Sequence, residues 1–161
     1  MKKIPLIVAT LLMLSACTKD DKALVGTTWS QSSESVSTHV ETGDTSSVSS
    51  HSFEIKFETA THGHAYLRNS ETHYWDETPH TYSIYGVFDV SYTFNGEEGT
   101  MTFTKEHCEG VNVADEFLDE FWNDPITSSF YTYADDSKIL LYSCPSSMAY
   151  YTSHIIVLTK E

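Results

Sequence analysis

The sequence predicts an all-β domain, an antiparallel barrel or sandwich of short strands that carries one short amphipathic helix. Three observations support this fold class. Apolar and polar residues alternate with a period of two in several short segments, turn-type residues separate the segments, and one helical pattern stands out. The chain has 161 residues, of which 40% are hydrophobic and 13% aromatic, a composition that suits one globular domain.

The alternating segments recur at short intervals along the chain. The clearest contains Phe53, Ile55 and Phe57, which alternate with polar neighbours as in a half-buried strand. The turn sequences 95–99 and 134–137 each separate two such segments and therefore predict hairpins. We expect strands at 53–57, 65–67, 88–94, 101–103, 130–133, 139–142 and 155–158.

The stretch from 27 to 52 is very rich in serine and threonine and allows two interpretations. It fits a mucin-like or disordered segment. It also fits an exposed two-strand ribbon, with Val36 and Val40 on one side of a Gly43-Asp44 turn and Val48 on the other. We favour the ribbon.

One amphipathic helix is predicted over 114–122. Asn112 can cap its N-terminus, and Pro125 lies just past its end. We expect the apolar face to pack on the sheet, while a lid over a barrel mouth is the alternative. The apolar face contains Phe117, Leu118, Phe121 and Trp122, and the acidic face contains Asp115, Glu116, Asp119 and Glu120.

The N-terminus has the order of a secretory signal peptide. Lys2 and Lys3 precede an apolar run over 4–14, which is too short to span a bilayer as a helix. Leu14-Ser15-Ala16-Cys17 resembles the lipobox of bacterial lipoproteins, which implies a diacylglycerol on the Cys17 sulfur and cleavage before this residue. The expected organisation is a signal peptide at 1–16, an acylated linker at 17–23 and a domain at 24–161.

The residues that follow the lipobox also carry a resemblance. Cys17-Thr18-Lys19-Asp20-Asp21 is similar to the export signal of Bacteroidetes-type surface lipoproteins. This resemblance implies an outer-membrane protein, lipid-anchored and facing the cell exterior. A plain solvated linker is the alternative explanation of these charged residues.

The start of the domain resembles that of lipocalin-like lipoproteins. Leu24-Val25-Gly26-Thr27-Thr28-Trp29 is similar to the segment that opens the first barrel strand in that family, and the closing segment 154–160 is consistent with it. The resemblance implies an antiparallel up-and-down β-barrel of about eight strands. Trp29 would then plug the closed end of the barrel, or lie as an ordinary core residue.

Lipidation of Cys17 leaves two cysteines in a compartment that oxidises thiols. We therefore expect a disulfide between Cys108 and Cys144. Two buried thiols are the alternative.

The formal net charge of −14 argues against two classes of partner. So acidic a surface repels phosphate backbones and anionic lipid, so we expect neither nucleic-acid binding nor polybasic membrane docking. The membrane partner is expected through the lipid anchor alone.

No catalytic motif is visible, and the sequence predicts neither an enzyme nor a cofactor. His62, His64, His73 and His80 fall within 19 residues, but HExxH and calcium-loop patterns do not occur. We therefore expect these histidines to be exposed strand and turn residues, with no metal site.

The densest polar-aromatic stretch runs from His73 to His80 and contains Tyr74, Trp75 and Asp76, and Tyr82 follows it closely. Aromatic rings there could stack on a sugar or another flat ligand while carboxylates accept its hydroxyl protons in hydrogen bonds. A loop folded back on the barrel is the alternative.

Two functions follow from these observations. The first is a non-catalytic binding module for a small apolar or glycan ligand. The second is an interaction lipoprotein with a filled barrel that binds another envelope or host protein. The occupancy of the lumen distinguishes them, because five aromatic residues would fill an eight-stranded core if all pointed inward: Phe53, Phe57, Phe88, Tyr92 and Phe103.

Overall fold

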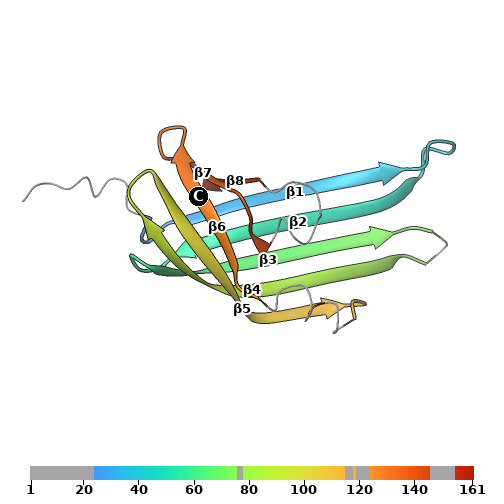
Figure 1. Cartoon of the computed structure of the whole chain (residues 1–161). Coiled ribbons are helices and arrows are strands. Elements are labelled where there is room, and N and C mark those ends of the chain that lie inside the picture. Colours follow the sequence, from blue (N-terminus) through green and yellow to red (C-terminus); the bar gives the residue numbers. More distant parts are fainter. Residues whose placement is uncertain (1–23, 76–77, 115–117, 119–123, 146–154) are drawn as a thin grey trace, which may run out of the picture.

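The computed structural model describes residues 24–75, 78–114, 118, 124–145 and 155–161. Eight antiparallel strands close into an up-and-down barrel in which each strand pairs with its neighbours in the chain and β8 pairs with β1 (Figure 1). This confirms the all-β class and the eight-stranded barrel. The strands are β1 (Thr28–Thr38), β2 (Thr45–Phe57), β3 (His62–His73), β4 (His80–Phe94), β5 (Glu98–Val111), β6 (Ile126–Tyr133), β7 (Lys138–Leu141) and β8 (Ile156–Lys160).

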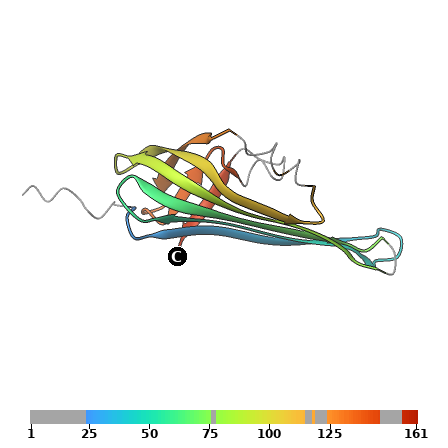
Figure 2. The same ribbon diagram turned by 90° about the horizontal axis from the view of Figure 1, so that it is seen from below.

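The barrel is strongly asymmetric because its first five strands are much longer than its last three. β8 pairs with β1 only at Trp29 and Ser30. β6 pairs only with residues 98–103 of β5. Beyond these pairings the long strands continue as an open five-stranded sheet, which projects from one end of the barrel (Figures 1 and 2). We call this sheet the extension; it comprises 31–38, 45–53, 67–73, 80–86 and 108–111.

The apolar core lies inside the barrel, where the alternating residues of all eight strands meet. Burial of these side chains is the main stabilising contribution to such a fold. The β2 side chains Phe53, Ile55 and Phe57 all point inward, as their alternation predicts. The largest fully buried side chains are Trp29, Phe53, Phe57, Phe88, Phe103, Phe130, Ile55, Leu67, Met101, Ile139, Leu141 and Leu158.

The β4–β5 hairpin shows how local sequence sets a turn. The Asn95 side-chain oxygen accepts hydrogen bonds from the amides of Glu97 and Glu98, both at 3.0 Å, while Gly96 takes a positive φ of 98°. Position 99 requires a glycine, because a Cβ there would lie 1.9 Å from the Thr93 carbonyl oxygen. The hairpin predicted at 95–99 is confirmed.

The ribbon interpretation of the Ser/Thr-rich stretch is also confirmed. β1 and β2 pair along their whole length, with Val36 opposite Val48, and Gly43 lies in the connecting turn at a φ of 76°. This ribbon forms one side of the extension.

The predicted helix lies mostly outside the described residues. Of the residues 114–122, the structure describes only Ala114 and Leu118. The φ of Asn112, the expected cap, is 56°, and its side-chain amide donates to the Thr81 carbonyl at 2.6 Å. Leu118 is buried in the barrel core, and its amide donates to the Ala114 carbonyl at 3.3 Å.

The expected disulfide is not confirmed. No bond between Cys108 and Cys144 is present in the part of the chain that the structure describes. Cys144 is fully buried in the core, and Cys108 is half-buried on β5 and packs against that core. Both side chains therefore face the same interior, and the disulfide stays a prediction.

The predicted signal peptide and linker, 1–23, fall outside the described residues. Within the described residues, no helix has both the length and the apolar character needed to cross a bilayer.

Candidate functional site

The inner face of the extension continues the inner wall of the barrel, but its side chains are polar. Because side chains alternate along a strand, every second residue beyond the buried Phe53 and Leu67 faces the same side as the core. The register places these residues in successive rows across the sheet. The first row contains His51, Asn69 and Ile84, the second Ser49, Glu71 and Tyr82, and the last Ser47, His73 and His80.

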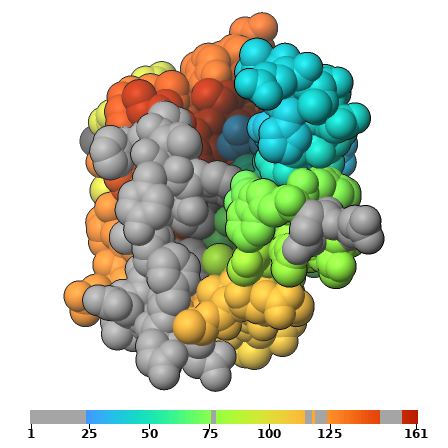
Figure 3. Space-filling view, turned by 90° about the vertical axis from the view of Figure 1, so that its right-hand side faces the viewer, coloured from blue at the N-terminus to red at the C-terminus, as the bar shows by residue number. Residues whose placement is uncertain are grey.

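Seen end-on, the tips of the β1–β2 and β3–β4 hairpins and the end of β5 form an arc around a hollow (Figure 3). A cavity of about 120 Å³ lies on this inner face and is lined in part by Asn69, Glu71, Tyr82 and Val113. The extension is therefore a curved surface with a polar concave side.

His51 forms the transition between the apolar core and this polar face. Its Nδ1–H donates to the Asn69 side-chain oxygen across the β2–β3 pair at 2.6 Å. Partial burial lowers the pKa of His51 from its usual 6.5, and the hydrogen bond to Asn69 offsets only part of this effect. The imidazole is therefore neutral at pH 7, and it presents polar edges without a charge.

Four rings gather at the tip of the extension, and we call them the Trp75 cluster: His73, Trp75, His80 and Tyr82. The Trp75 indole stacks on His73 at 4.6 Å between ring centroids and on His80 at 5.8 Å. Tyr82 meets His73 edge-on at 6.1 Å. Glu71 adds a carboxylate oxygen 3.3 Å from Nε2 of His73.

The Trp75 cluster gives the extension an apolar platform that is open to solvent. The Trp75 side chain is 65% exposed although two imidazoles stack on it. A flat, exposed ring held in place beside carboxylate, amide and hydroxyl groups suits a ligand with an apolar face and a polar rim, such as a sugar.

The structure brings together two of the four predicted ligand-binding residues. Trp75 and Tyr82 both contact His73. Tyr74 is exposed, and its amide donates to the Ser46 carbonyl at 2.9 Å, which ties the end of β3 to β2. Asp76 lies outside the described residues.

Sequence reasoning missed the part that His73 and His80 play in this cluster. Both histidines end the polar-aromatic stretch 73–80, but the sequence analysis assigns ligand contacts only to Tyr74, Trp75, Asp76 and Tyr82. The signal that could have found them is the hairpin itself, because His73 ends β3, His80 begins β4, and the β3–β4 register places the two opposite each other.

The lumen of the barrel is filled by side chains. All five aromatic residues that could fill it point inward, and each is at most 5% exposed: Phe53, Phe57, Phe88, Tyr92 and Phe103. Small polar residues at inward positions would have left a cavity, but Ser83, Ser91 and Thr102 alternate with inward-facing neighbours and face outward. A ligand inside this part of the barrel would have to displace the core.

A second hollow, of about 770 Å³, lies over β1–β4 of the extension. Most of its lining residues alternate toward the outer face, among them Arg68, the only arginine of the chain. The Arg68 guanidinium carbon lies 5.2 Å from the centroid of the Tyr85 ring. This face offers one cation on an aromatic ring in an otherwise serine-rich surface.

Comparison of the chain with protein-family models, curated proteins and solved structures finds no match.

Proposed function

We propose that this protein is a lipid-anchored surface lipoprotein whose domain is a non-catalytic binding module, and that a glycan binds the inner face of the extension. The observation that carries the proposal is the Trp75 platform, exposed at the tip of a concave polar sheet. The filled lumen supports a site on this face over a site inside the barrel.

The direction of β1 supports an outward-facing site. The first described residue, Leu24, precedes β1 at the barrel end, and the 11 residues of β1 run from there into the extension. At about 3.3 Å per residue, β1 covers roughly 35 Å. Lipidation of Cys17 would hold the barrel end near the outer membrane and direct the Trp75 cluster away from it.

We assign the barrel to a lipocalin-like type. Its eight strands follow one another up and down, and the Gly26–Trp29 opening leads directly into β1. Trp29 is buried in the core, and the Lys160 ammonium of the closing strand lies 5.8 Å from its ring centroid. Trp29 thus joins the first and last strands, which is consistent with the resemblance.

A second function is an interaction lipoprotein that binds another envelope or host protein. The filled core favours it, because the buried side chains leave no space for a small ligand inside the barrel. In the described part of the chain, residues 31–38 of β1 pair only with β2. Their other edge could accept a strand from a partner protein.

A glycan array tests the proposed function. The full chain, purified in mild detergent and labelled, is expected to bind a restricted set of glycans, and Trp75→Ala to lose at least tenfold in affinity. Tyr133→Ala is the matched control, since Tyr133 is an exposed aromatic residue outside the extension. An array without signal, together with capture of one defined envelope or host protein, would replace the glycan proposal by the second function.

A further inference from the structure

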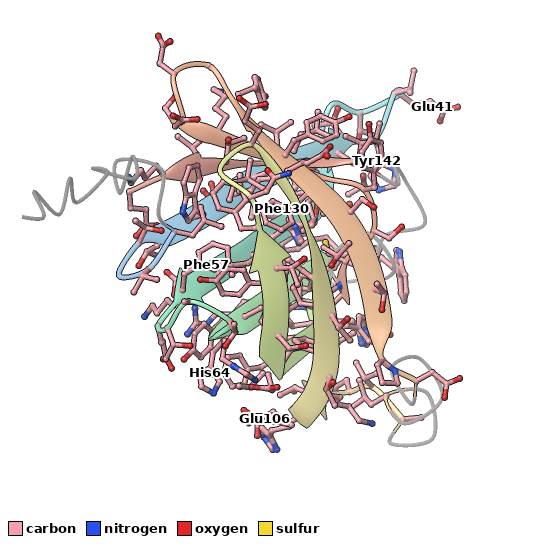
Figure 4. All side chains as sticks on the ribbon, turned by 60° about the vertical axis from the view of Figure 1, so that its left-hand side comes forward. Glu41, Phe57, His64, Glu106, Phe130 and Tyr142 are labelled. Carbon is pink, nitrogen blue, oxygen red and sulfur yellow. The ribbon has the colours of Figure 1, made fainter. Side chains whose placement is uncertain are left out.

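Three side chains from three neighbouring strands meet on the outer face of the barrel, far from the Trp75 cluster in the sheet. His64 on β3 pairs directly with Asp89 on β4, and Glu106 on β5 lies beside them. One nitrogen or oxygen atom of each side chain lies within 4.8 Å of the other two. Figure 4 shows His64 and Glu106 near each other at the surface, away from the interior that holds Phe57 and Phe130.

A β-bulge brings Glu106 to this position. Phe88 pairs with Lys105 and Val87 with His107, so Glu106 is the one extra residue of β5. Bulges of this kind redirect a side chain and occur often next to functional sites. Here the bulge leaves the Glu106 carboxylate 3.7 Å from Nε2 of His64.

The other edge of the His64 ring faces a second carboxylate. Nδ1 of His64 lies 3.2 Å from Oε1 of Glu58, but the contact does not have hydrogen-bond geometry. This buried nitrogen therefore has no hydrogen-bond partner in the described part of the chain. A histidine that binds a metal through one nitrogen commonly donates its other N–H to a carboxylate, and the Glu58 carboxylate, 3.2 Å away, would take that role once it is realigned.

The local charge favours a cation. Glu58, Asp89 and Glu106 surround a single imidazole, in a chain with a formal charge of −14. The neighbouring cation Lys56, opposite His64 on β2, lies 3.2 Å from a Glu54 oxygen. Three carboxylates close together create a potential that attracts a divalent ion.

We propose that His64, Asp89 and Glu106 bind one Zn²⁺ ion, with Glu58 orienting the imidazole. Nε2 of His64 and one oxygen of each carboxylate supply three ligands, and water completes the coordination, as in open zinc sites. Tetrahedral ligands at about 2.1 Å from the ion are about 3.4 Å apart, so the three side chains must close by an ångström or so. All three reach the surface, and Glu106 is exposed, so this movement disturbs no core packing.

This inference departs from the sequence-based expectation of no metal site, and it is independent of the glycan proposal. The sequence analysis compares four histidines that lie close together in the chain. The carboxylates of this site are distant in the sequence, because Asp89 is on β4 and Glu106 is in the bulge of β5. Among the described residues, this is the one group of three such side chains that could hold an ion.

The test is zinc titration of the full chain, purified in mild detergent without a polyhistidine tag, in competition with a chromophoric chelator. We expect one zinc ion per chain, a loss of at least 100-fold in affinity in His64→Ala and Glu106→Gln, and a 10- to 100-fold loss in Glu58→Gln. Circular dichroism of each variant checks that the barrel is folded.

His107→Ala and Glu109→Gln are the matched controls. These residues form an exposed histidine–glutamate pair on the same strand, with Nε2 of His107 3.5 Å from the Glu109 carboxylate. Both controls are expected to retain wild-type zinc affinity. Zinc binding that persists in folded His64→Ala and Glu106→Gln, or that is lost in the controls, would overturn the proposal, as would the absence of binding by the wild type.

Discussion

The indole of Trp75 stacks on the imidazole of His73, with the ring centroids 4.6 Å apart and the planes 26° from parallel. The same indole stacks on His80, which lies opposite His73 in the β3–β4 register. The hairpin thus holds a large exposed ring in a defined orientation at the tip of the extension. Orientation before binding reduces the entropy lost when a ligand stacks on the ring.

Stability is expected to fall on acidification, in part because of His51. Its pKa is lowered in the folded protein by partial burial, so below about pH 6.5 the unfolded chain binds a proton more readily than the folded one. The contribution is small at pH 7, where most of the imidazole is neutral in both states, and grows as the pH falls toward 5. Urea unfolding should therefore show that the free energy of unfolding falls less between pH 7 and pH 5 in His51→Gln than in the wild type.

His39→Gln serves as the control for that experiment, because His39 is exposed at the end of the β1–β2 ribbon. An identical pH dependence in His51→Gln and His39→Gln would mean that His51 does not contribute.

Gly99→Ala is expected to destabilise the barrel by at least about 2 kcal/mol. The added Cβ would lie 1.9 Å from the Thr93 carbonyl oxygen and 2.6 Å from the Phe130 ring, and a backbone atom cannot move aside cheaply. Gly43→Ala, at a positive φ but with nothing within 4 Å of the new Cβ, should cost only about 1 kcal/mol. Urea unfolding of both variants gives the comparison, and equal losses would contradict the packing argument.

Protein recovered from an oxidising compartment is expected to contain a Cys108–Cys144 bond. Both side chains face the same core, and removal of such a bond costs about 2–4 kcal/mol. Mass spectrometry after unfolding and alkylation without a reductant should find neither cysteine alkylated. Alkylation of both would establish that the core contains two thiols.

Cys17→Ala is expected to release the protein from membranes, because the lipid anchor is the only membrane attachment that the sequence predicts. The measurement is the distribution of the protein between the outer-membrane pellet and the soluble fraction. A variant that still sediments with the outer membrane would disprove the anchor.

Local patterns predicted much of the barrel. The alternation at Phe53–Phe57 and the Asn95-Gly96 turn each carry their own structural signal, so strands and hairpins could be found from sequence. Trp75 and Tyr82 could likewise be selected as exposed aromatic candidates.

The extension and the outer carboxylate cluster could not be predicted, because both depend on long-range register. No local feature shows that β8 leaves β1 after Ser30. Glu106 continues the outward alternation set by the buried Met101 and Phe103, so the sequence shows no sign that it is the extra residue of a bulge.

The most direct test of the central claim is a map of where the ligand binds. The full chain, labelled with ¹⁵N in detergent micelles, would be titrated with the strongest glycan from the array and followed by the shifts of its amide signals. The account predicts changes at the inner face of the extension, around Glu71, His73 and Tyr82, with those of Phe57 and Phe103 unchanged. Changes confined to the barrel core or to the outer face around Arg68 would contradict it.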